Sequence, residues 1–306
     1  MKERVEIFVA THKQIPADLP EGYIKAQVNC ANSHEHWEGY VHDDSLDNIS
    51  EKNPNYSELS VMYWAWKNSN ADIKGIAHYR RFLSKINTCQ YKPIIYGDLN
   101  HLELRILEED EIVNYLKSFD VLLAMPNGPY PISAMEELKL FVYDRDIQIM
   151  EEVIKCDYPD YYAAFNDVMN SKHLNYFNML IAKSSVFDAY CEWIFDVLGK
   201  IEKKCDLSGY DAQHSRIYGY LSEVLQNVYI KKNGLSKKNF IILQPYQMKD
   251  MDSESYKKML KREEFFNKMR CSGLGVIEDT YYRMFHSDLY NNCRIFSNYL
   301  QAEKEQ

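Results

Sequence analysis

Short apolar runs alternate with longer segments of helical spacing along most of the chain. Strands are expected within residues 4–13, 73–81, 118–127, 176–183 and 239–246. Helices are expected within residues 48–68, 144–169, 184–201, 211–234 and 252–270. This alternation predicts an α/β fold with a mainly parallel central sheet.

Local signals give the expected ends of these helices. We expect a helix start near Pro54 and a break near Pro159, since proline suits a first helical turn and interrupts a helix interior. The helix after the fourth strand is expected to be capped at Ser184 or Ser185, and the following one to stop at Gly234.

Three of the expected strands end in polar residues, at positions 11–13, 78–81 and 126–128. In open α/β sheets, ligands bind at the carboxyl ends of the parallel strands. The three polar ends are therefore expected to share one edge of the sheet, where a binding site would lie.

The second of these ends has an unusual sequence, His78-Tyr79-Arg80-Arg81. The guanidinium group of arginine matches phosphate oxygens, and paired arginines can neutralise a diphosphate without a metal ion. Because arginine pairs also form structural ion pairs, the motif alone leaves both interpretations open.

Composition narrows the function classes. The chain has 306 residues, enough for one large domain or for a domain with an appendage. Its net charge of −9 argues against broad nucleic-acid binding, which needs a basic face. The 25 tyrosines suit contact with carbohydrate or nucleobase rings, or ordinary core packing.

The cysteine spacing and the length of the apolar runs indicate in which cellular compartment the protein is expected. The seven cysteines show no Cys-x-x-Cys pair and no zinc-ligand spacing, which is typical of reduced thiols. The start of the chain has only a six-residue apolar run, and no segment approaches the ~20 apolar residues of a membrane span. We therefore expect a cytoplasmic, soluble protein.

The loop around Asp43, Asp44, Asp47 and Asn48 is acidic. Such side chains can bind a divalent metal ion or accept hydrogen bonds from ribose or sugar hydroxyls. A polar loop with an Asx turn has the same composition.

Motifs for common catalytic classes are missing: the sequence has no G-x-S-x-G, Walker A or G-x-G-x-x-G pattern. A general base would then have to be Asp, Glu or His. Arg216 and Glu223 are seven residues apart and can lie on one face of a helix, although either can be a structural ion-pair member. The carboxylates considered are Asp144, Asp146, Glu136, Glu137 and Glu223.

The C-terminal part differs from the rest of the chain in composition, since residues 252–270 form a charged segment with interspersed apolar residues. It predicts a solvated packing helix, with contact to an anionic lipid surface as the alternative.

Several stretches between about residues 7 and 230 together resemble one family: VATHK, DNISEKNPNYSELSVMYWAWKN, IKGIAHYRRFL, NMLIAKSSVFDAYCEWIFDVL and RIYGYLSEVLQNVYI. This is the family of domain of unknown function 4422. Its members are bacterial glycosyltransferases of capsule, exopolysaccharide and O-antigen synthesis, some of them β-1,3-galactofuranosyltransferases. The resemblance implies a GT-A-like domain that binds a nucleotide-sugar donor at the strand ends.

The resemblance also implies site residues. Many GT-A enzymes have an Asp-x-Asp metal motif where this chain has the HYRR sequence, so we expect no required metal, with Mn²⁺ or Mg²⁺ as the alternative. Asp146 lies at an acidic position of the family and is the first candidate for the catalytic base, with Glu223 as the second. The residues implied at the donor site are Thr11, His12, Lys13, Asp44, Asp47, Asn48, His78, Tyr79, Arg80, Arg81, Asn178 and Arg216.

The sequence thus predicts a glycosyltransferase domain at residues 1–250 with a helical extension at 251–306. We expect an inverting enzyme that moves a sugar, such as galactofuranose from its UDP donor, onto a lipid-linked oligosaccharide at the inner face of the membrane. The alternatives are a phosphosugar-modifying enzyme and a non-catalytic carbohydrate-binding or scaffold protein of a polysaccharide assembly complex.

Overall fold

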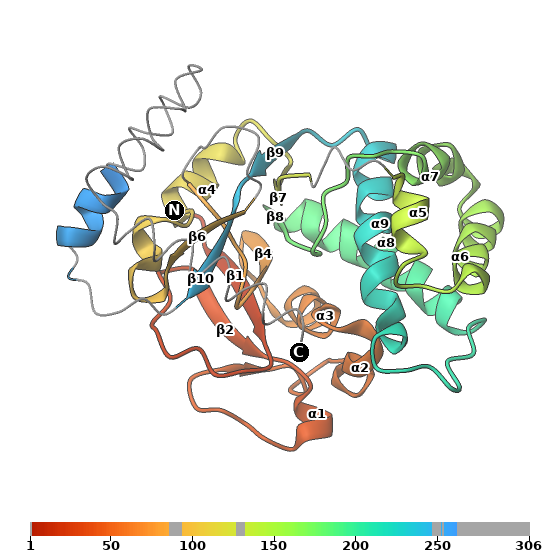
Figure 1. Ribbon diagram of the computed structural model, residues 1–306, viewed down its shortest axis with the longest axis horizontal. Helices are drawn as coiled ribbons and strands as arrows, with labels where there is room; N and C mark the ends of the chain where they lie inside the picture. The colour runs from red at the N-terminus through yellow and green to blue at the C-terminus, as the bar shows by residue number, and fades with distance from the viewer. Residues whose placement is uncertain (1, 86–93, 127–131, 247–251, 253, 262–306) are drawn as a thin grey trace, which may run out of the picture. The chain divides into compact units, whose positions relative to one another are not determined.

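The computed structural model describes residues 2–85, 94–126, 132–246, 252 and 254–261 (Figure 1). The chain divides into two compact units, one of residues 1–85 and 93–248, the other of residues 86–92 and 249–306. In the second unit, residues 254–261 are helical. The rest of the helix expected within 252–270 lies outside the described residues.

The first unit contains a seven-stranded sheet with the order β3-β2-β1-β4-β8-β7-β9. A smaller sheet has the order β5-β10-β6. The strands are β1 (Val5–Thr11), β2 (Tyr23–Gln27), β3 (Val41–His42), β4 (Ile73–His78), β5 (Phe82–Leu83), β6 (Ile94–Asp98), β7 (Val121–Ala124), β8 (Leu180–Lys183), β9 (Lys237–Phe240) and β10 (Ile242–Tyr246).

The large sheet is parallel except at β8, which runs antiparallel to both β4 and β7. At its centre β1 and β4 pair in register, with Ile7 opposite Gly75 and Val9 opposite Ala77. The carboxyl ends of these two strands therefore lie side by side, as the sequence predicts. The prediction of an α/β fold with a mainly parallel sheet is confirmed.

Helices account for most of the remaining described elements. The α-helices are α1 (Cys30–Ser33), α2 (Asn53–Tyr56), α3 (Leu59–Asn68), α4 (Glu109–Tyr115), α5 (Ala134–Leu138), α6 (Asp144–Asp157), α7 (Tyr162–Met169), α8 (Ser184–Glu202) and α9 (Ile217–Lys232). The short 3-10 helices are η1 (Ser50–Lys52), η2 (Leu99–Leu104), η3 (Pro159–Tyr161) and η4 (His214–Arg216).

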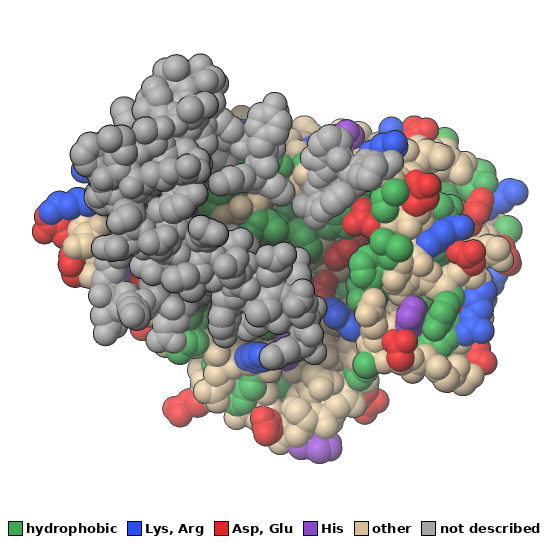
Figure 2. All heavy atoms as spheres, viewed as in Figure 1, with side chains coloured by type: hydrophobic (Ala, Val, Ile, Leu, Met, Phe, Trp, Pro, Cys, Tyr) green, Lys and Arg blue, Asp and Glu red, His purple; other side chains and the backbone are tan. Residues whose placement is uncertain are grey.

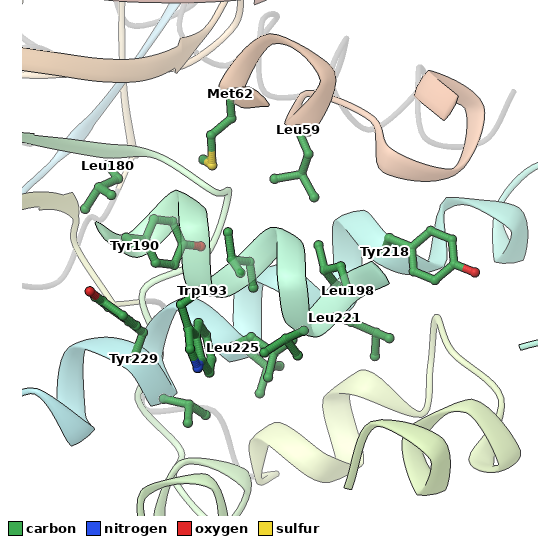
Figure 3. Close-up of a cluster of buried hydrophobic side chains, with 14 of the residues drawn as sticks. Leu59, Met62, Leu180, Tyr190, Trp193, Leu198, Tyr218, Leu221, Leu225 and Tyr229 are labelled. Carbon is green, nitrogen blue, oxygen red and sulfur yellow. The ribbon is translucent and has the colours of Figure 1, made fainter. Parts of the chain in front are cut away.

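The core lies where α3 and α8 pack against the sheet and α9 packs on α8 (Figure 3). Leu59 and Met62 of α3 face apolar side chains of α8 and α9, among them Tyr190, Leu198 and Leu221, all of which are buried. Close packing of this kind fixes the helices relative to the strand ends, so side chains at their termini are held in place.

Some local expectations are wrong. No side chain caps α8, whose N-cap residue is Lys183 and not a serine. The apolar run at 239–246 is two strands, β9 in the large sheet and β10 in the small one. Strands β2 and β3 were not expected, because β2 is only partly buried and β3 has two residues.

Gly75 is expected to be intolerant of a side chain. A Cβ atom at this position would lie 2.7 Å from Ile181 Cγ1 and 2.8 Å from Ile7 Cδ1. Overpacking of this kind costs about 1–3 kcal/mol. Urea unfolding of Gly75→Ala should show that loss, whereas Gly199→Ala, where no atom lies within 4 Å of the added Cβ, should not. Equal stability of the two variants would contradict the packing described here.

Among the described residues, no helix has the length and apolar character needed to cross a bilayer. On the face seen in Figure 2, acidic and basic side chains are interspersed over the helices α5–α7, so this region is not a surface of one sign of charge.

Candidate active site

A pocket of about 690 Å³ lies at the carboxyl ends of β1 and β4. Its other walls come from the α2–α3 junction, α5, the segment before β8, and the start of α9. The expected site residues that line it are Thr11, His12, His78, Tyr79, Arg80, Arg81, Arg216 and Glu223. The structure thus brings together two of the three polar strand ends; of the third, Asn127 and Gly128 lie outside the described residues.

The HYRR sequence forms a tight turn at the end of β4. The backbone N–H of His78 donates to the Arg81 carbonyl at 3.2 Å, and the Arg81 N–H donates back to the His78 carbonyl at 2.9 Å. The Tyr79 N–H donates to the carbonyl of Ala10 on β1. These bonds occupy the backbone, so the turn presents its side chains at the mouth of the pocket.

His78 is a neutral donor and not a third cation of this turn. Its Nε2 donates to the Phe177 carbonyl at 2.7 Å, and the same nitrogen lies 3.9 Å from Glu58 Oε1. Burial lowers the pKa of His78 despite the nearby Glu58 carboxylate, and Arg81 and Arg80 lower it further. The imidazole is therefore uncharged at neutral pH and orients the wall formed by Phe177.

Three arginines from two parts of the chain line the pocket. Arg80 is exposed, and the guanidinium of Arg81 lies 4.3 Å from the centre of the Phe177 ring. Arg216, at the start of α9, donates from Nε to Ser57 Oγ at 3.1 Å. Their guanidinium groups make the pocket mouth attractive to an anion with several oxygens.

Two carboxylates face this cationic wall. Glu223 on α9 accepts a hydrogen bond from the Phe177 N–H at 3.1 Å, and Glu58 accepts one from Asn178 Nδ2 at 2.6 Å. Burial and then the charge of Glu58 raise the pKa of Glu223 to about 8, against the opposing effects of the Phe177 N–H, Arg81 and Arg216. A carboxyl group with such a pKa can exchange a proton near neutral pH.

This raised pKa predicts how stability depends on pH. Between the ordinary pKa of 4.5 and about 8, folded Glu223 keeps a proton that the unfolded chain has released. The free energy of unfolding should therefore fall as the pH rises through this window. Urea unfolding at pH 5 to 9 should show the decline in the wild type and a flatter profile in Glu223→Gln. Parallel profiles for the two proteins would be the contrary result.

Left-handed backbone conformations gather around the pocket. Ser57, Phe177 and Asn29 line it with φ angles of 53°, 79° and 66°, and Asn178 next to Phe177 has a φ of 49°. Non-glycine residues rarely adopt such angles, and they concentrate where the surrounding structure holds functional groups in place.

Buried hydrogen bonds hold the segment before β8 in this conformation. Asn175 donates from Nδ2 to the Ala124 carbonyl, and its backbone N–H and carbonyl both bond the Asn227 side chain. Asn178 is buried behind the pocket and bonds the Gly219 carbonyl and Ser222 in addition to Glu58. Asn178 therefore positions Glu58.

Asp146 does not line the pocket. It is buried on α6, where its Oδ2 accepts a hydrogen bond from the Tyr210 hydroxyl at 2.5 Å. Glu137, considered with it, does line the pocket and accepts a hydrogen bond from Tyr176.

The acidic loop and Lys13 also lie outside the pocket lining. Asp47 accepts from the Tyr63 hydroxyl, and Asn48 bonds the backbone of its own loop. Asp44 lies beside His36, with its Oδ2 2.8 Å from Nε2. Neighbouring Asp43 is buried and accepts from the N–H groups of residues 29 and 30.

Sequence reasoning missed Glu58 and Phe177. Glu58 is the N-cap residue of α3, directly after the strained Ser57 that separates α2 from α3. Phe177 contributes a ring, a carbonyl and an N–H to the site. A Glu at a helix start, next to a Ser, is only a weak sequence signal for a site residue. The backbone groups that Phe177 contributes leave no signal in the sequence.

Comparisons with known proteins agree with this picture. The profile of the family described as domain of unknown function, DUF4422, matches residues 6–234. Among solved structures, the chain is similar to WbbM, a bifunctional glycosyltransferase in its apo form, with a TM-score of 0.69 and 26% sequence identity. The match covers 81% of this chain and 48% of WbbM, so the chain spans about half the length of that protein. No curated protein sequence matches the chain significantly.

The fold likeness to a glycosyltransferase is consistent with the expected GT-A-like architecture, with its mainly parallel sheet and a pocket at the strand ends. The family profile covers more than half of the 306 residues. The chain therefore belongs to the DUF4422 family.

Proposed function

We propose that this protein is a glycosyltransferase that uses a nucleotide-sugar donor. The observation that carries the proposal is the combination, in one pocket, of the cations Arg80, Arg81 and Arg216 with the carboxylates Glu58 and Glu223. A transferase needs cations for the departing diphosphate and a base for the acceptor hydroxyl. The similarity to WbbM, itself described as a glycosyltransferase, supports the same activity.

In this proposal the diphosphate lies at the HYRR turn. Arg81 and Arg80 come from the turn itself and Arg216 from the start of α9, so oxygens on two phosphates can be bonded at once. Thr11 and His12, at the end of β1, lie beside the nucleotide in this arrangement. The cations stabilise the leaving group most as its charge develops.

The pocket residues do not fit the divalent cation that many GT-A enzymes bind. No Asp is among the described lining residues, and a turn with two arginines lies at the pocket, where the family resemblance implies the place of an Asp-x-Asp pair. The lining carboxylates Glu58, Glu137 and Glu223 each already accept a hydrogen bond, from Asn178, Tyr176 and Phe177 respectively. We therefore propose donor binding without a metal ion.

For the transfer step we propose Glu223 as the base, because it lines the pocket and Asp146 does not. The acceptor hydroxyl gives its proton to the Glu223 carboxylate while its oxygen forms a bond to the anomeric carbon. The bond from that carbon to the diphosphate oxygen breaks, and the electron pair leaves with the nucleoside diphosphate. In-line attack of this kind inverts the anomeric configuration.

The finer assignments follow from the family resemblance. We propose UDP-galactofuranose as the first donor to test and a lipid-linked oligosaccharide of capsule, exopolysaccharide or O-antigen synthesis as the acceptor. Such an acceptor would place the reaction at the inner face of the membrane.

The test is a panel of UDP-sugars, each incubated with the protein and a lipid-linked oligosaccharide acceptor, with release of UDP as the measurement. One donor should release UDP at least tenfold faster than the others, and only when acceptor is present. Binding of the glycan without any nucleotide binding would overturn the proposal in favour of a scaffold protein.

A further inference from the structure

A cluster of metal-ligand side chains lies in the segments that follow β2 and β3, at the end of the strand order away from β8, β7 and β9. The Cys30 sulfur, a ring nitrogen of His36 and a carboxylate oxygen of Asp44 all lie within 4.8 Å of one another. None of the three lines the pocket. The mechanism above gives them no role.

The three side chains come from separate segments that nothing in the sequence spacing brings together. Cys30 begins α1, His36 lies in the loop after that helix, and Asp44 follows β3. Cys30 is buried, Asp44 is partly exposed and the His36 side chain is half exposed. The cluster is therefore reachable from solvent on one side and closed on the other.

The chemistry of these ligands selects a cation. Thiolate, imidazole and carboxylate are the ligands of Zn²⁺, which is four-coordinate and bound at about 2.0–2.3 Å from each ligand atom. Tetrahedral ligands at such distances lie roughly 3.3–3.8 Å apart. The ion would therefore shorten the longer separations in the cluster and take the place of the hydrogen bond between His36 Nε2 and Asp44 Oδ2, whose atoms lie 2.8 Å apart. Neutral imidazole, one thiolate and one carboxylate balance the charge of the ion.

The surroundings of the cluster also favour a cation. The Asp43 carboxylate is completely buried next to Cys30 and accepts hydrogen bonds from the Cys30 N–H at 3.0 Å and from the Ser50 and Ser60 hydroxyls at 2.6 Å. Its negative charge therefore lies close to Cys30. A divalent cation in front of it would be attracted by that charge in a region of low dielectric.

We propose that Cys30, His36 and Asp44 form a zinc site that fixes the loop of residues 34–44 to α1. On binding, the Cys30 S–H bond breaks, its proton goes to solvent and the sulfur bonds the ion. The fourth position is left for water. Asn29, the neighbour of Cys30, lines the donor pocket, so the ion stabilises one wall of that pocket without touching the nucleotide.

The test uses Co²⁺ as a spectroscopic substitute for Zn²⁺ on the full chain after removal of metals with a chelator. One equivalent should give the intense near-ultraviolet charge-transfer band of a cobalt–thiolate bond, and Zn²⁺ should abolish it. Cys30→Ser should lose the band. His36→Ala, at a half-exposed position, should keep the fold by circular dichroism and weaken Co²⁺ binding roughly 10- to 100-fold.

The matched control is Cys156→Ser, which removes an exposed thiol of α6. It should leave the band and the affinity unchanged. A wild-type protein without a charge-transfer band, or a band that survives in Cys30→Ser, would overturn the proposal. So would weak Co²⁺ binding that all variants share, since this would show adventitious carboxylate sites only.

Discussion

Glu223→Gln is expected to lower the turnover number about 100- to 10,000-fold, the usual contribution of a general base. Gln has the shape of the protonated carboxyl group and keeps an oxygen to accept from the Phe177 N–H. Because the pKa of Glu223 is raised to about 8, the wild-type side chain is mostly protonated at pH 7. UDP affinity at pH 7 should therefore change little, and the loss should fall on turnover.

The pH dependence of the turnover number is a second test of Glu223 as the base. If Glu223 must be deprotonated to act, the wild-type turnover number should rise with pH and level off above about 8. The residual activity of Glu223→Gln should lack that rise. Steady-state kinetics with saturating donor at pH 6 to 9 measure both.

Asp146→Asn is the matched control, because it makes the same carboxylate-to-amide change outside the pocket. Asp146 accepts from the Tyr210 hydroxyl in a buried position. Asn keeps an oxygen that can accept this bond and removes only its charge, so the free energy of unfolding should fall by at most about 1–3 kcal/mol. The turnover number of Asp146→Asn should remain within about threefold of the wild type, a much smaller change than the loss of a general base causes. A variant series in which Asp146→Asn is inactive and Glu223→Gln is active would reverse the assignment of the base.

Arg81→Ala is expected to weaken UDP binding about 10- to 100-fold, which corresponds to the ~1.5–3 kcal/mol of a charge-assisted hydrogen bond. Arg81 is half-buried and lies against the Phe177 ring, so its guanidinium is held in place before the nucleotide arrives. Exposed Arg80 should contribute less, since solvent screens the charge of its side chain. Titration calorimetry with UDP measures each variant.

Arg145→Ala is the control for the loss of a positive charge. Arg145 is an exposed residue of α6 that contacts Tyr210 and lies outside the pocket lining. Its removal should leave UDP affinity within about twofold, because Arg145 does not line the pocket and the charge of an exposed side chain is screened by salt. An equal effect of Arg145→Ala and Arg81→Ala would indicate a general electrostatic effect and not a phosphate site.

The strand-end features were predictable from the sequence. His78, Arg80 and Arg81 follow an apolar run with strand character, and parallel β1 and β4 necessarily end at the same edge of the sheet. Arg216 and Glu223 both line the pocket, Arg216 from the N-cap position of α9 and Glu223 from within that helix, and their spacing of seven residues, about two turns, indicates this proximity. In both cases a local pattern fixes the relative position of the residues.

The remaining site features depend on tertiary structure. Glu58 reaches the pocket because the backbone turns at Ser57 with a φ of 53°. The residue types around Ser57 do not predict this turn. Phe177 acts through its backbone as well as its ring. Asp146 was favoured as the base from its family position, but the packing of α6 directs it toward Tyr210. The Cys30–His36–Asp44 cluster likewise arises from three segments with no ligand spacing in the chain.

The central claim, a nucleotide site at the HYRR turn that needs no metal ion, is tested most directly by titrating UDP into the wild-type protein and Arg81→Ala in EDTA. Repeating both titrations with excess Mn²⁺ completes the experiment. We predict wild-type binding in EDTA, little gain with Mn²⁺, and a 10- to 100-fold weaker affinity in the variant. Wild-type binding only with Mn²⁺, or equal affinities of the two proteins, would contradict the claim.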